Sequence, residues 1–321
     1  MDSALRRIRI AVSTGRLRGL PAEPGTPEIT LLGAGESYVA WRIGSGDQAQ
    51  VLRVPRRSPH EMPRSMMAEF ETLRRVPPEL GTSAIALETG TDNPLGIPYM
   101  VTTHVSGRAL RATDWNPRLA TALAHQIARL HEAFATSPAP SAVFVPSAGE
   151  QGEELLTWWG RHHPETLTDP RVTALLPAWR RELTRLAPAF EAVPIHPLIH
   201  GDVVVTNVIL GPDGVPRLID FEWSGPGDRA KDLALIGGRV IGGPWYLPMT
   251  PDDVAAFVTE YSRHSCHAGA IDPQRLLERR DAYELLDRMG NLLYCLSRPG
   301  EARYGMWADE IARNLTDRLA D

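Results

Sequence analysis

The first hundred residues form a series of short apolar segments separated by turns. Segments rich in branched and aromatic side chains lie at 29–34, 37–43, 50–54, 84–88 and 99–105. The run Gly44-Ser45-Gly46-Asp47 between the second and third segments is typical of a hairpin turn. This pattern predicts a small antiparallel sheet near the start of the chain.

One main helix is predicted within this region. Met62, Met66, Phe70 and Leu73 are spaced by four, four and three residues, which places them on one face of a helix over 61–76. The two prolines that follow end it.

The pattern changes to helix after Gly107, which ends the last strand. Asn116 is a suitable cap for a helix whose apolar face recurs at Leu119, Leu123, Ile127, Leu130 and Phe134. The segment 136–152 is rich in Pro, Ser, Ala and Gly and predicts a surface loop. Further on, the pattern predicts a helix at about 179–190, short strands at 208–210 and 217–220, and helical stripes to the end. We therefore predict an α+β chain, with an N-terminal sheet lobe at 1–106 and a larger helical lobe at 107–321.

The composition narrows the class of protein. A formal net charge of -5 provides no basic face for nucleic acid. No apolar run reaches the roughly 18 residues of a membrane span, and arginines interrupt the N-terminus where a signal core would lie. Only Cys266 and Cys295 are present, which fits a reducing compartment. We expect a soluble, cytoplasmic protein with no nucleic-acid or membrane partner; its oligomeric state is not readable from the sequence.

The strongest chemical signal begins at His200-Gly201-Asp202. Asn207 follows after four residues, and Asp220 ends the short strand beyond it. Protein kinases use this spacing for a catalytic aspartate and two magnesium ligands. Magnesium prefers carboxylate and amide oxygens, which Asp220 and Asn207 supply, while Asp202 would orient an accepting hydroxyl and receive its proton.

Asp232 has two interpretations. It could hold the loop around Asp202 by accepting backbone N–H groups, or it could simply cap a helix.

The run from His200 to Ala234 resembles the signature of the aminoglycoside phosphotransferase superfamily. That signature is His-Gly-Asp, four residues, Asn, then Ile-Asp-Phe or Ile-Asp-Trp, then Gly-Asp-x-Ala-x-Asp-Leu-Ala. The resemblance implies a protein-kinase-like two-lobed fold and phosphorylation of a small-molecule hydroxyl. It also implies Asp202 as catalytic base, Asn207 and Asp220 as Mg²⁺ ligands, and a structural role for His200.

The nucleotide would bind to the first lobe. The glycine turn that contains Gly33, Gly35 and Ser37 lets backbone amides approach phosphates, although a plain hairpin has the same sequence. The purine of ATP or GTP would lie near Thr102, Thr103, His104 and Val105, where backbone contacts leave the choice of nucleotide open.

The third strand carries Arg53 where such folds have a lysine, and Lys231 is the only lysine of the chain. Arginine can hold phosphate in two-pronged geometry. Glu69 is the expected partner of Arg53 and Glu71 the alternative. The opposing interpretation is an exposed ion pair on a solvated face.

A second resemblance concerns the sequence around Arg53. The run from Val51 to Arg57, followed by Met67-Ala68-Glu69, resembles the macrolide phosphotransferases, a branch whose members can prefer GTP. The catalytic loop departs from that branch, since 203–206 reads Val-Val-Val-Thr in place of Leu-His-Pro-Gly.

The acceptor is weakly specified. Residues 251–321 carry 13 Asp and Glu against nine Arg, which would attract an amine, and Trp245 with Tyr246 could line an apolar acceptor. Solvated helix faces and buried packing explain the same features.

Three function classes follow. The first is a phosphotransferase of an antibiotic, macrolide ahead of aminoglycoside, that gives resistance or self-protection. The second is a kinase of a sugar or amino-alcohol metabolite, and the third is a non-catalytic nucleotide-binding module. Intact Asp202, Asn207 and Asp220 disfavour the third.

Overall fold

The computed structural model describes residues 2–21, 28–136, 144–265 and 272–320. The chain forms two compact units. The N-terminal unit comprises residues 1–108 together with 209–213 and 217–224, and the helical unit comprises the remainder. The segment that carries Asp220 thus belongs to the N-terminal unit, although it follows far later in the chain.

A five-stranded antiparallel sheet forms the centre of the N-terminal unit, as the sequence predicts. Its strand order is β1-β2-β3-β5-β4. The strands are β1 Ile29–Ala34, β2 Tyr38–Ile43, β3 Gln50–Pro55, β4 Ala84–Glu88 and β5 Tyr99–Thr103.

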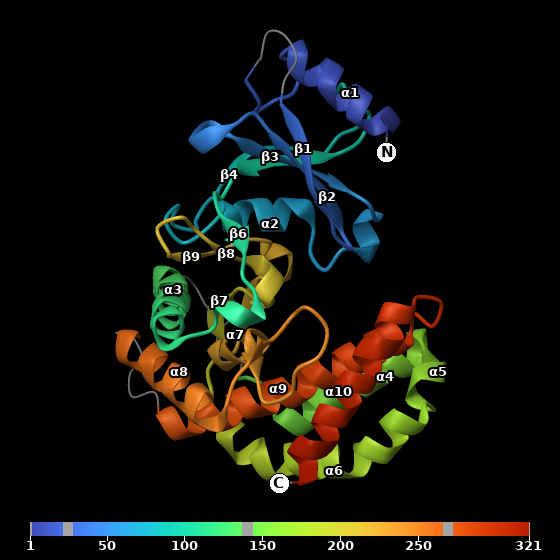
Figure 1. Cartoon of the computed structure of the whole chain (residues 1–321), viewed down its shortest axis with the longest axis vertical. Helices are drawn as coiled ribbons and strands as arrows, with labels where there is room; N and C mark the ends of the chain where they lie inside the picture. Colours follow the sequence, from blue (N-terminus) through green and yellow to red (C-terminus); the bar gives the residue numbers. More distant parts are fainter. Residues whose placement is uncertain (1, 22–27, 137–143, 266–271, 321) are drawn as a thin grey trace. The chain divides into compact units, whose positions relative to one another are not determined.

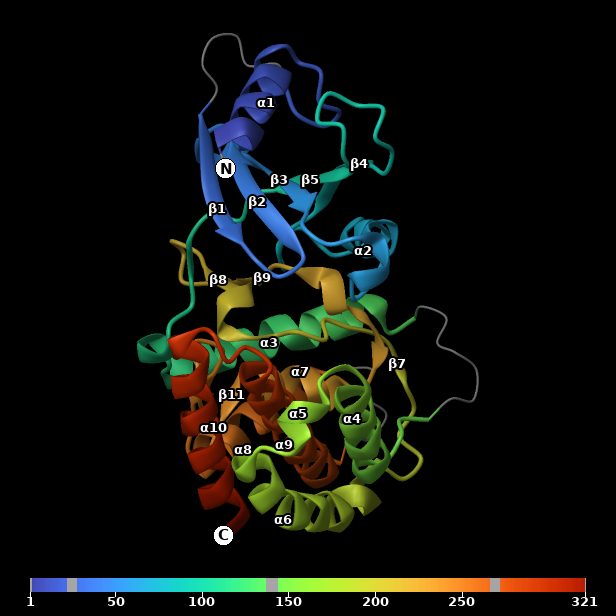
Figure 2. The same ribbon diagram turned by 90° about the vertical axis from the view of Figure 1, so that its right-hand side faces the viewer.

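The two faces of this sheet have different partners. Helix α1, Asp2–Ser13, lies on one face and helix α2, Met66–Leu73, on the other (Figures 1 and 2). The buried residues Ile8 and Val12 of α1 pack in one core with Leu52 of β3. Because side chains alternate along a strand, Leu52 toward α1 places Arg53 on the face of α2.

The predicted helix over 61–76 is too long, and α1 is not among the predicted elements. Helix α2 begins after Ser65, whose hydroxyl accepts the Ala68 N–H at 3.2 Å. Pro63 precedes this cap, and a separate 3₁₀ turn occupies Pro59–Glu61. Proline is disfavoured in a helix interior and Ser65 caps α2, so the apolar spacing continues across a helix start.

The helical unit contains the remaining helices that the structure describes. They are α3 Pro117–Phe134, α4 Ala148–His162, α5 Pro164–Leu167, α6 Pro170–Leu186, α7 Arg229–Leu235, α8 Pro251–His264, α9 Pro273–Leu296 and α10 Ala302–Ala320. Its short strands are β7 His196–Ile199, β10 Gly225–Gly227, β11 Gly237–Gly238 and β12 Leu247–Pro248. Further short strands of the chain are β6 Arg108–Ala109, β8 Val208–Leu210 and β9 Pro216–Leu218.

Three boundaries in this unit can be compared with the sequence analysis. Asn116 caps α3 through the Leu119 N–H, as predicted. The predicted loop over 136–152 is wrong at its end, because Ser147 and Glu150 form a capping box that starts α4; residues 137–143 lie outside the described part. Helix α6 begins well before residue 179 and ends at Leu186.

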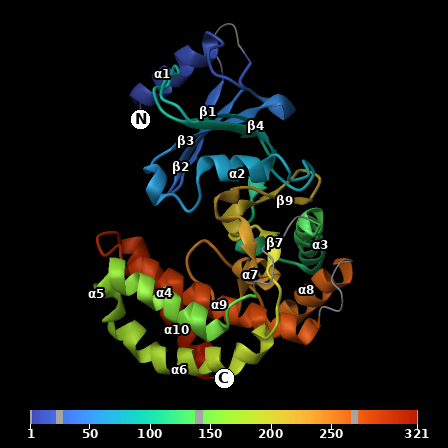
Figure 3. The same cartoon turned by 180° about the vertical axis from the view of Figure 1, so that it is seen from behind.

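Helix α9 is the central helix of the helical unit and packs against α4, α6, α7, α8 and α10 (Figure 3). Its Arg288 is fully buried. The guanidinium donates to the carbonyls of Val240 at 2.9 Å and Ala234 at 3.2 Å. Glu284 of the same helix accepts the Val240 N–H at 2.7 Å. The buried charges of Arg288 and Glu284 therefore fix the segment that follows α7.

No helix in the described ranges is both long and apolar enough to cross a bilayer. Cys295 is buried and carries a free thiol, while Cys266 lies outside the described residues.

Two glycines of α4 differ in their surroundings and give a matched test of the packing. A Cβ on Gly152 would lie 2.8 Å from Leu183 and 2.9 Å from the fully buried Trp179, whereas a Cβ on Gly149 meets nothing within 4 Å. We expect Gly152→Ala to destabilise the protein by about 1–3 kcal/mol through overpacking. Gly149→Ala should stabilise it by roughly 0.5–1 kcal/mol, because alanine is the better helix former.

Chemical unfolding of both variants beside the wild type measures these changes. Equal midpoints for the two variants would contradict the packing described here.

Candidate functional site

The loop that carries Asp202 follows β7 and leads into a 3₁₀ turn at Val205–Asn207. Gly201 has a φ of 80°, a conformation that favours glycine. The Asn207 side-chain amide donates to the Asp202 carboxylate at 2.7 Å and to its backbone carbonyl at 3.1 Å. The structure therefore brings these two predicted residues into direct contact, and the bond turns the carbonyl oxygen of Asn207 away from Asp202.

Asp232 anchors this loop. Its fully buried carboxylate accepts the backbone N–H of His200 at 2.7 Å and that of Gly201 at 2.8 Å. His131 of α3 contacts the same carboxylate at 3.0 Å through Nε2. The loop-holding interpretation is confirmed, and the capping interpretation is wrong, because the cap of α7 is Asp228.

The electrostatics of Asp232 agree with this role. Burial by itself raises the pKa of a carboxyl, but the hydrogen bond and charge of His131, with the His200 N–H, bring the pKa of Asp232 below its ordinary value. His200 is buried, and its Nδ1 accepts the Asp202 N–H at 3.3 Å. This contact supports the loop from within, as expected for a structural residue.

The three valines that depart from the macrolide pattern have a packing explanation. Val203, Val204 and Val205 are all buried. The Val205 N–H donates to the Trp245 carbonyl at 2.9 Å, which joins the loop to the segment held by α9. Apolar side chains at these positions seat the loop in the core of the helical unit.

Arg53 is the centre of a buried charged cluster in the N-terminal unit. Its guanidinium contacts the Glu69 carboxylate and donates to Asp220 at 2.5 Å. Arg53 is 7% exposed and Glu69 only 1%, so the solvated-face interpretation is wrong. Glu71, the alternative partner, instead pairs with Arg74 at the surface. One arginine thus bridges a helix carboxylate and the predicted metal ligand.

The carboxyl group of Glu222, in the same unit, has a raised pKa. No role was predicted for this residue from the sequence. Burial, and then the neighbouring charge of Asp220, raises the pKa of Glu222 to about 7. Tyr38 lies beneath the Arg53 guanidinium, 4.2 Å from the ring centre. A second carboxylate two residues after a predicted metal ligand is the signal that could have identified Glu222.

The glycine turn joins β1 to β2. The Gly35 N–H donates to the Tyr38 carbonyl at 2.9 Å. A Cβ on Gly33 meets nothing within 4 Å, and one on Gly35 meets only that carbonyl, so neither position is crowded. Ser37 is buried beside Glu222. This arrangement leaves room for a phosphate to approach the backbone, and it is also that of a plain hairpin, so a nucleotide role stays a prediction.

The residues predicted to meet the purine lie at the end of β5. Thr103 is exposed, and its hydroxyl accepts the Ser83 N–H at 2.9 Å. The His104 N–H donates to the Ala49 carbonyl at 3.3 Å. Val105 follows and is half-buried. Some backbone groups here are thus already hydrogen-bonded within the N-terminal unit. Contact with a purine stays a prediction.

The two aromatic residues proposed for an acceptor wall have different roles. Tyr246 is buried, stacks under Arg288 at 3.4 Å and donates its hydroxyl to Asp287 at 2.7 Å. Its packing interpretation is therefore correct. Trp245 is half-buried and meets Trp307 edge-on, with ring centres 5.1 Å apart.

Comparison with known proteins decides the family. The model of the phosphotransferase enzyme family matches residues 28–283. The chain belongs to this family. None of the curated proteins matches its sequence. It is a small-molecule kinase that transfers a phosphoryl group from a nucleotide to a hydroxyl acceptor.

Solved structures confirm the protein-kinase-like fold of this phosphotransferase at low sequence identity. A choline kinase of Cryptosporidium parvum Iowa II is 13% identical, with 98% of this chain and 94% of that one covered and a TM-score of 0.62. The GDP complex of aminoglycoside 2'-phosphotransferase-IIIa is 16% identical over 100% and 99%, with a TM-score of 0.63. Plasmodium vivax ethanolamine kinase is 11% identical over 100% and 95%, with a TM-score of 0.60.

The anchor of the loop is open to test in this phosphotransferase. Asp232→Asn places an amide N–H₂ where the carboxylate meets backbone N–H donors. We expect a loss of stability of at least about 2 kcal/mol, because buried donors lose their acceptor. Since the change displaces the Asp202 loop, kcat should fall much more than the nucleotide KM rises.

Chemical unfolding and steady-state kinetics measure the two effects. Asp272→Asn is the matched control, since asparagine caps a helix as well as aspartate does and Asp272 caps α9. Unchanged stability and kcat in the Asp232 variant would remove the anchoring role.

Proposed function

We propose that this phosphotransferase moves the γ-phosphate of ATP or GTP to a hydroxyl of a small molecule in a Mg²⁺-dependent reaction in the cytoplasm. The observation that carries the proposal is the Asp202 carboxylate held by the Asn207 amide at 2.7 Å, in a loop anchored by Asp232. Fixed positions for these groups are what phosphoryl transfer requires, because positioning and charge stabilisation supply most of its catalysis.

Each residue has a defined task in the proposed reaction. Asp202 orients the acceptor hydroxyl and takes its proton while the acceptor oxygen bonds to the γ-phosphorus and the bond to the bridging oxygen breaks. Arg53 would meet the nucleotide phosphates from β3, supported by Glu69. Backbone N–H groups near Gly33, Gly35 and Ser37 would lie along the phosphates.

The donor set fits magnesium. Asn207 offers an amide oxygen, and Asp220 retains a second carboxylate oxygen beside the one that meets Arg53. No cluster of three His, Cys, Asp or Glu side chains suited to a metal occurs within the described ranges. Magnesium does not need one, because it takes one or two protein oxygens and completes its shell with phosphates and water. When bound, it would neutralise charge on the transferring group.

An antibiotic is the proposed acceptor class, with a macrolide ahead of an aminoglycoside. The solved aminoglycoside phosphotransferase supports the class. The acidic excess over 251–321 gives little support to a polycationic acceptor, because many of its carboxylates are engaged within the protein. Asp253 and Asp272 cap helices, while Glu284 pairs with Arg280 and Asp309 with Arg171.

A second candidate is a kinase of an amino-alcohol. It is favoured by Trp245, whose carbonyl binds the catalytic loop and whose ring packs with Trp307 and Tyr294. Aromatic faces attract substituted ammonium groups. The likeness to the choline and ethanolamine kinases supports this candidate to a similar degree.

The decisive experiment supplies magnesium with ATP or GTP and a panel of macrolides, aminoglycosides and amino-alcohols. Acceptor mass and nucleotide consumption are read together. We expect one acceptor class to gain a single phosphate, and Asp202→Asn to reduce this by at least about 10³-fold, because asparagine cannot accept the proton. The variant keeps an oxygen for the Asn207 amide, so its fold should survive.

Asp252→Asn is the matched control, since Asp252 is exposed in the first turn of α8. Full turnover by the Asp202 variant would exclude Asp202 as the base. Removal of magnesium with a chelator should stop transfer, and turnover without any divalent ion would contradict the proposed role of Asn207 and Asp220.

The role of Arg53 is tested by the double change Arg53→Gln with Glu69→Gln, which removes both charges of the buried pair. We expect the nucleotide KM to rise by at least about tenfold, the cost of one charge-assisted hydrogen bond. The acceptor KM should change little. The control is Arg74→Gln, because Arg74 is an exposed residue at the C-terminal end of α2. A nucleotide KM equal to that of the wild type would exclude Arg53 from phosphate binding.

A further inference from the structure

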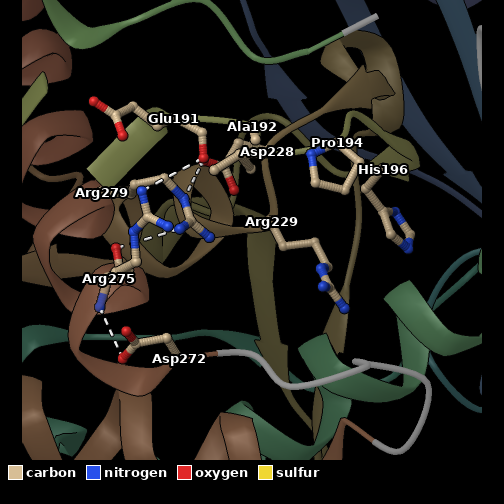
Figure 4. Close-up of a pocket in the computed structure, with 10 residues that line it drawn as sticks. Glu191, Ala192, Pro194, His196, Asp228, Arg229, Asp272, Arg275 and Arg279 are labelled. Atoms are coloured by element: carbon tan, nitrogen blue, oxygen red, sulfur yellow. Dashed lines mark hydrogen bonds and ion pairs between the residues drawn. The ribbon is translucent and has the colours of Figure 1, made fainter. Parts of the chain in front are cut away.

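The helical unit contains a cavity of about 190 Å³ in a part of the unit that the proposed reaction does not use. Its wall is formed by the chain between the 3₁₀ turn at Ala187–Phe190 and β7, the start of α7 and the start of α9 (Figure 4). Arg229, Arg275 and Arg279 line it together with Asp228, Asp272 and Glu191. The question is which of these charges the protein itself neutralises.

The aspartates of the cavity are already used. Asp228 caps α7 through the Ala230 N–H at 3.0 Å and accepts Arg279 Nε at 2.7 Å, with both side chains buried. Asp272 caps α9 through the backbone N–H groups of Gln274 and Arg275. One arginine and two carboxylates are thereby committed to the fold.

The carboxylate of Glu191 forms no ion pair with the described arginines of the cavity. Its carboxylate points away from Arg275 and Arg279 in Figure 4, and its backbone carbonyl accepts a long contact from Arg275 at 3.5 Å.

Two guanidinium groups remain without a carboxylate partner among the described residues. Arg275 donates to the Pro188 carbonyl at 2.6 Å, which satisfies a hydrogen bond but not the charge. Arg229 makes one long contact, to the Ser265 hydroxyl at 3.5 Å. Figure 4 shows the Arg229 side chain between those of Arg275 and His196. Both arginines are half-buried.

His196 adds no positive charge to the cavity. Burial, followed by the influence of His131 and Arg229, lowers the pKa of His196 to about 4. The imidazole is therefore neutral near pH 7, and the positive charges at the cavity are those of the arginines.

The segment that contributes Ala192 to the lining has an uncommon backbone conformation. Ala192 has a φ of 56°, in the left-handed region that a side chain with a Cβ rarely adopts. Such a conformation persists where the surrounding structure fixes it. The backbone in this part of the wall is therefore fixed by its surroundings.

We propose that this cavity binds a small oxyanion, a phosphate or a carboxylate, through Arg229 and Arg275. The planar fork of arginine matches the paired oxygens of both groups. A volume of about 190 Å³ suits an inorganic phosphate or a short dicarboxylate. The site is separate from Arg53 in the N-terminal unit, and the inference does not rest on the proposed function.

Titration calorimetry tests the proposal without turnover. Inorganic phosphate and malonate are titrated separately into the wild type at constant ionic strength, so that general screening is held fixed. We expect saturable binding of at least one anion. The anion that binds more tightly shows whether the cavity prefers a phosphate or a carboxylate. Arg229→Gln and Arg275→Gln should each weaken it by at least about tenfold.

Two further proteins keep the result specific. Arg263→Gln removes an exposed arginine of α8 that already pairs with Glu260 and should leave the affinity unchanged. The double variant at Arg53 and Glu69 should also bind as the wild type does. Equal affinity in all variants, loss of binding only in the Arg53 double variant, or no saturable binding of either anion to the wild type would each overturn the proposal. Thermal unfolding confirms that every variant is folded.

Discussion

The buried carboxylate of Asp232 is the constraint on which the candidate catalytic loop depends. A charge with no exposure is tolerated only where donors surround it, and here two backbone N–H groups and a histidine do so. The anchor joins three separate parts of the helical unit, because α7 brings the carboxylate, α3 brings His131 and the chain after β7 brings the loop. Any displacement of the loop leaves a buried charge unsatisfied. The conformation that positions Asp202 is therefore strongly favoured by the fold.

The N-terminal unit solves a similar problem with one arginine. Protein kinases carry a lysine on the third strand, and this chain has only Lys231, which lies elsewhere. A lysine ammonium is a point charge, whereas a guanidinium has separate N–H groups for separate acceptors. Arg53 uses this geometry to contact Glu69 with one nitrogen and Asp220 with another. The replacement therefore links the helix α2 to the predicted metal ligand within one unit, a connection that depends on the shape of the side chain and not on its charge alone.

Local signals were sufficient for part of this structure. The sheet, the cap of α3, the pairing of Arg53 with Glu69 and the fold class follow from periodicity, capping chemistry and the motif around Asp202. Helix α1 was missed because Ile8 and Val12 gain a partner only when distant strands form. The predicted start of α2 was wrong because apolar spacing continued across Pro63 and Ser65. Asp228 and Asp232 are both plausible caps in sequence, and only the tertiary contacts distinguish the cap from the loop anchor. Glu222 shows the same limit, since its raised pKa depends on burial beside Asp220.

Helix α7 relates the cavity to the catalytic loop. Asp228 at its cap is fixed by Arg279 of α9, Arg229 begins it at the cavity wall, and Asp232 in its first turn holds the loop. A helix of 7 residues has little freedom to bend between these points, since its hydrogen bonds join every turn to the next. An anion that bound Arg229 would stabilise the same turn that presents Asp232. Anion binding at the cavity would therefore reach the loop through one short element, α7, which carries both Arg229 and Asp232.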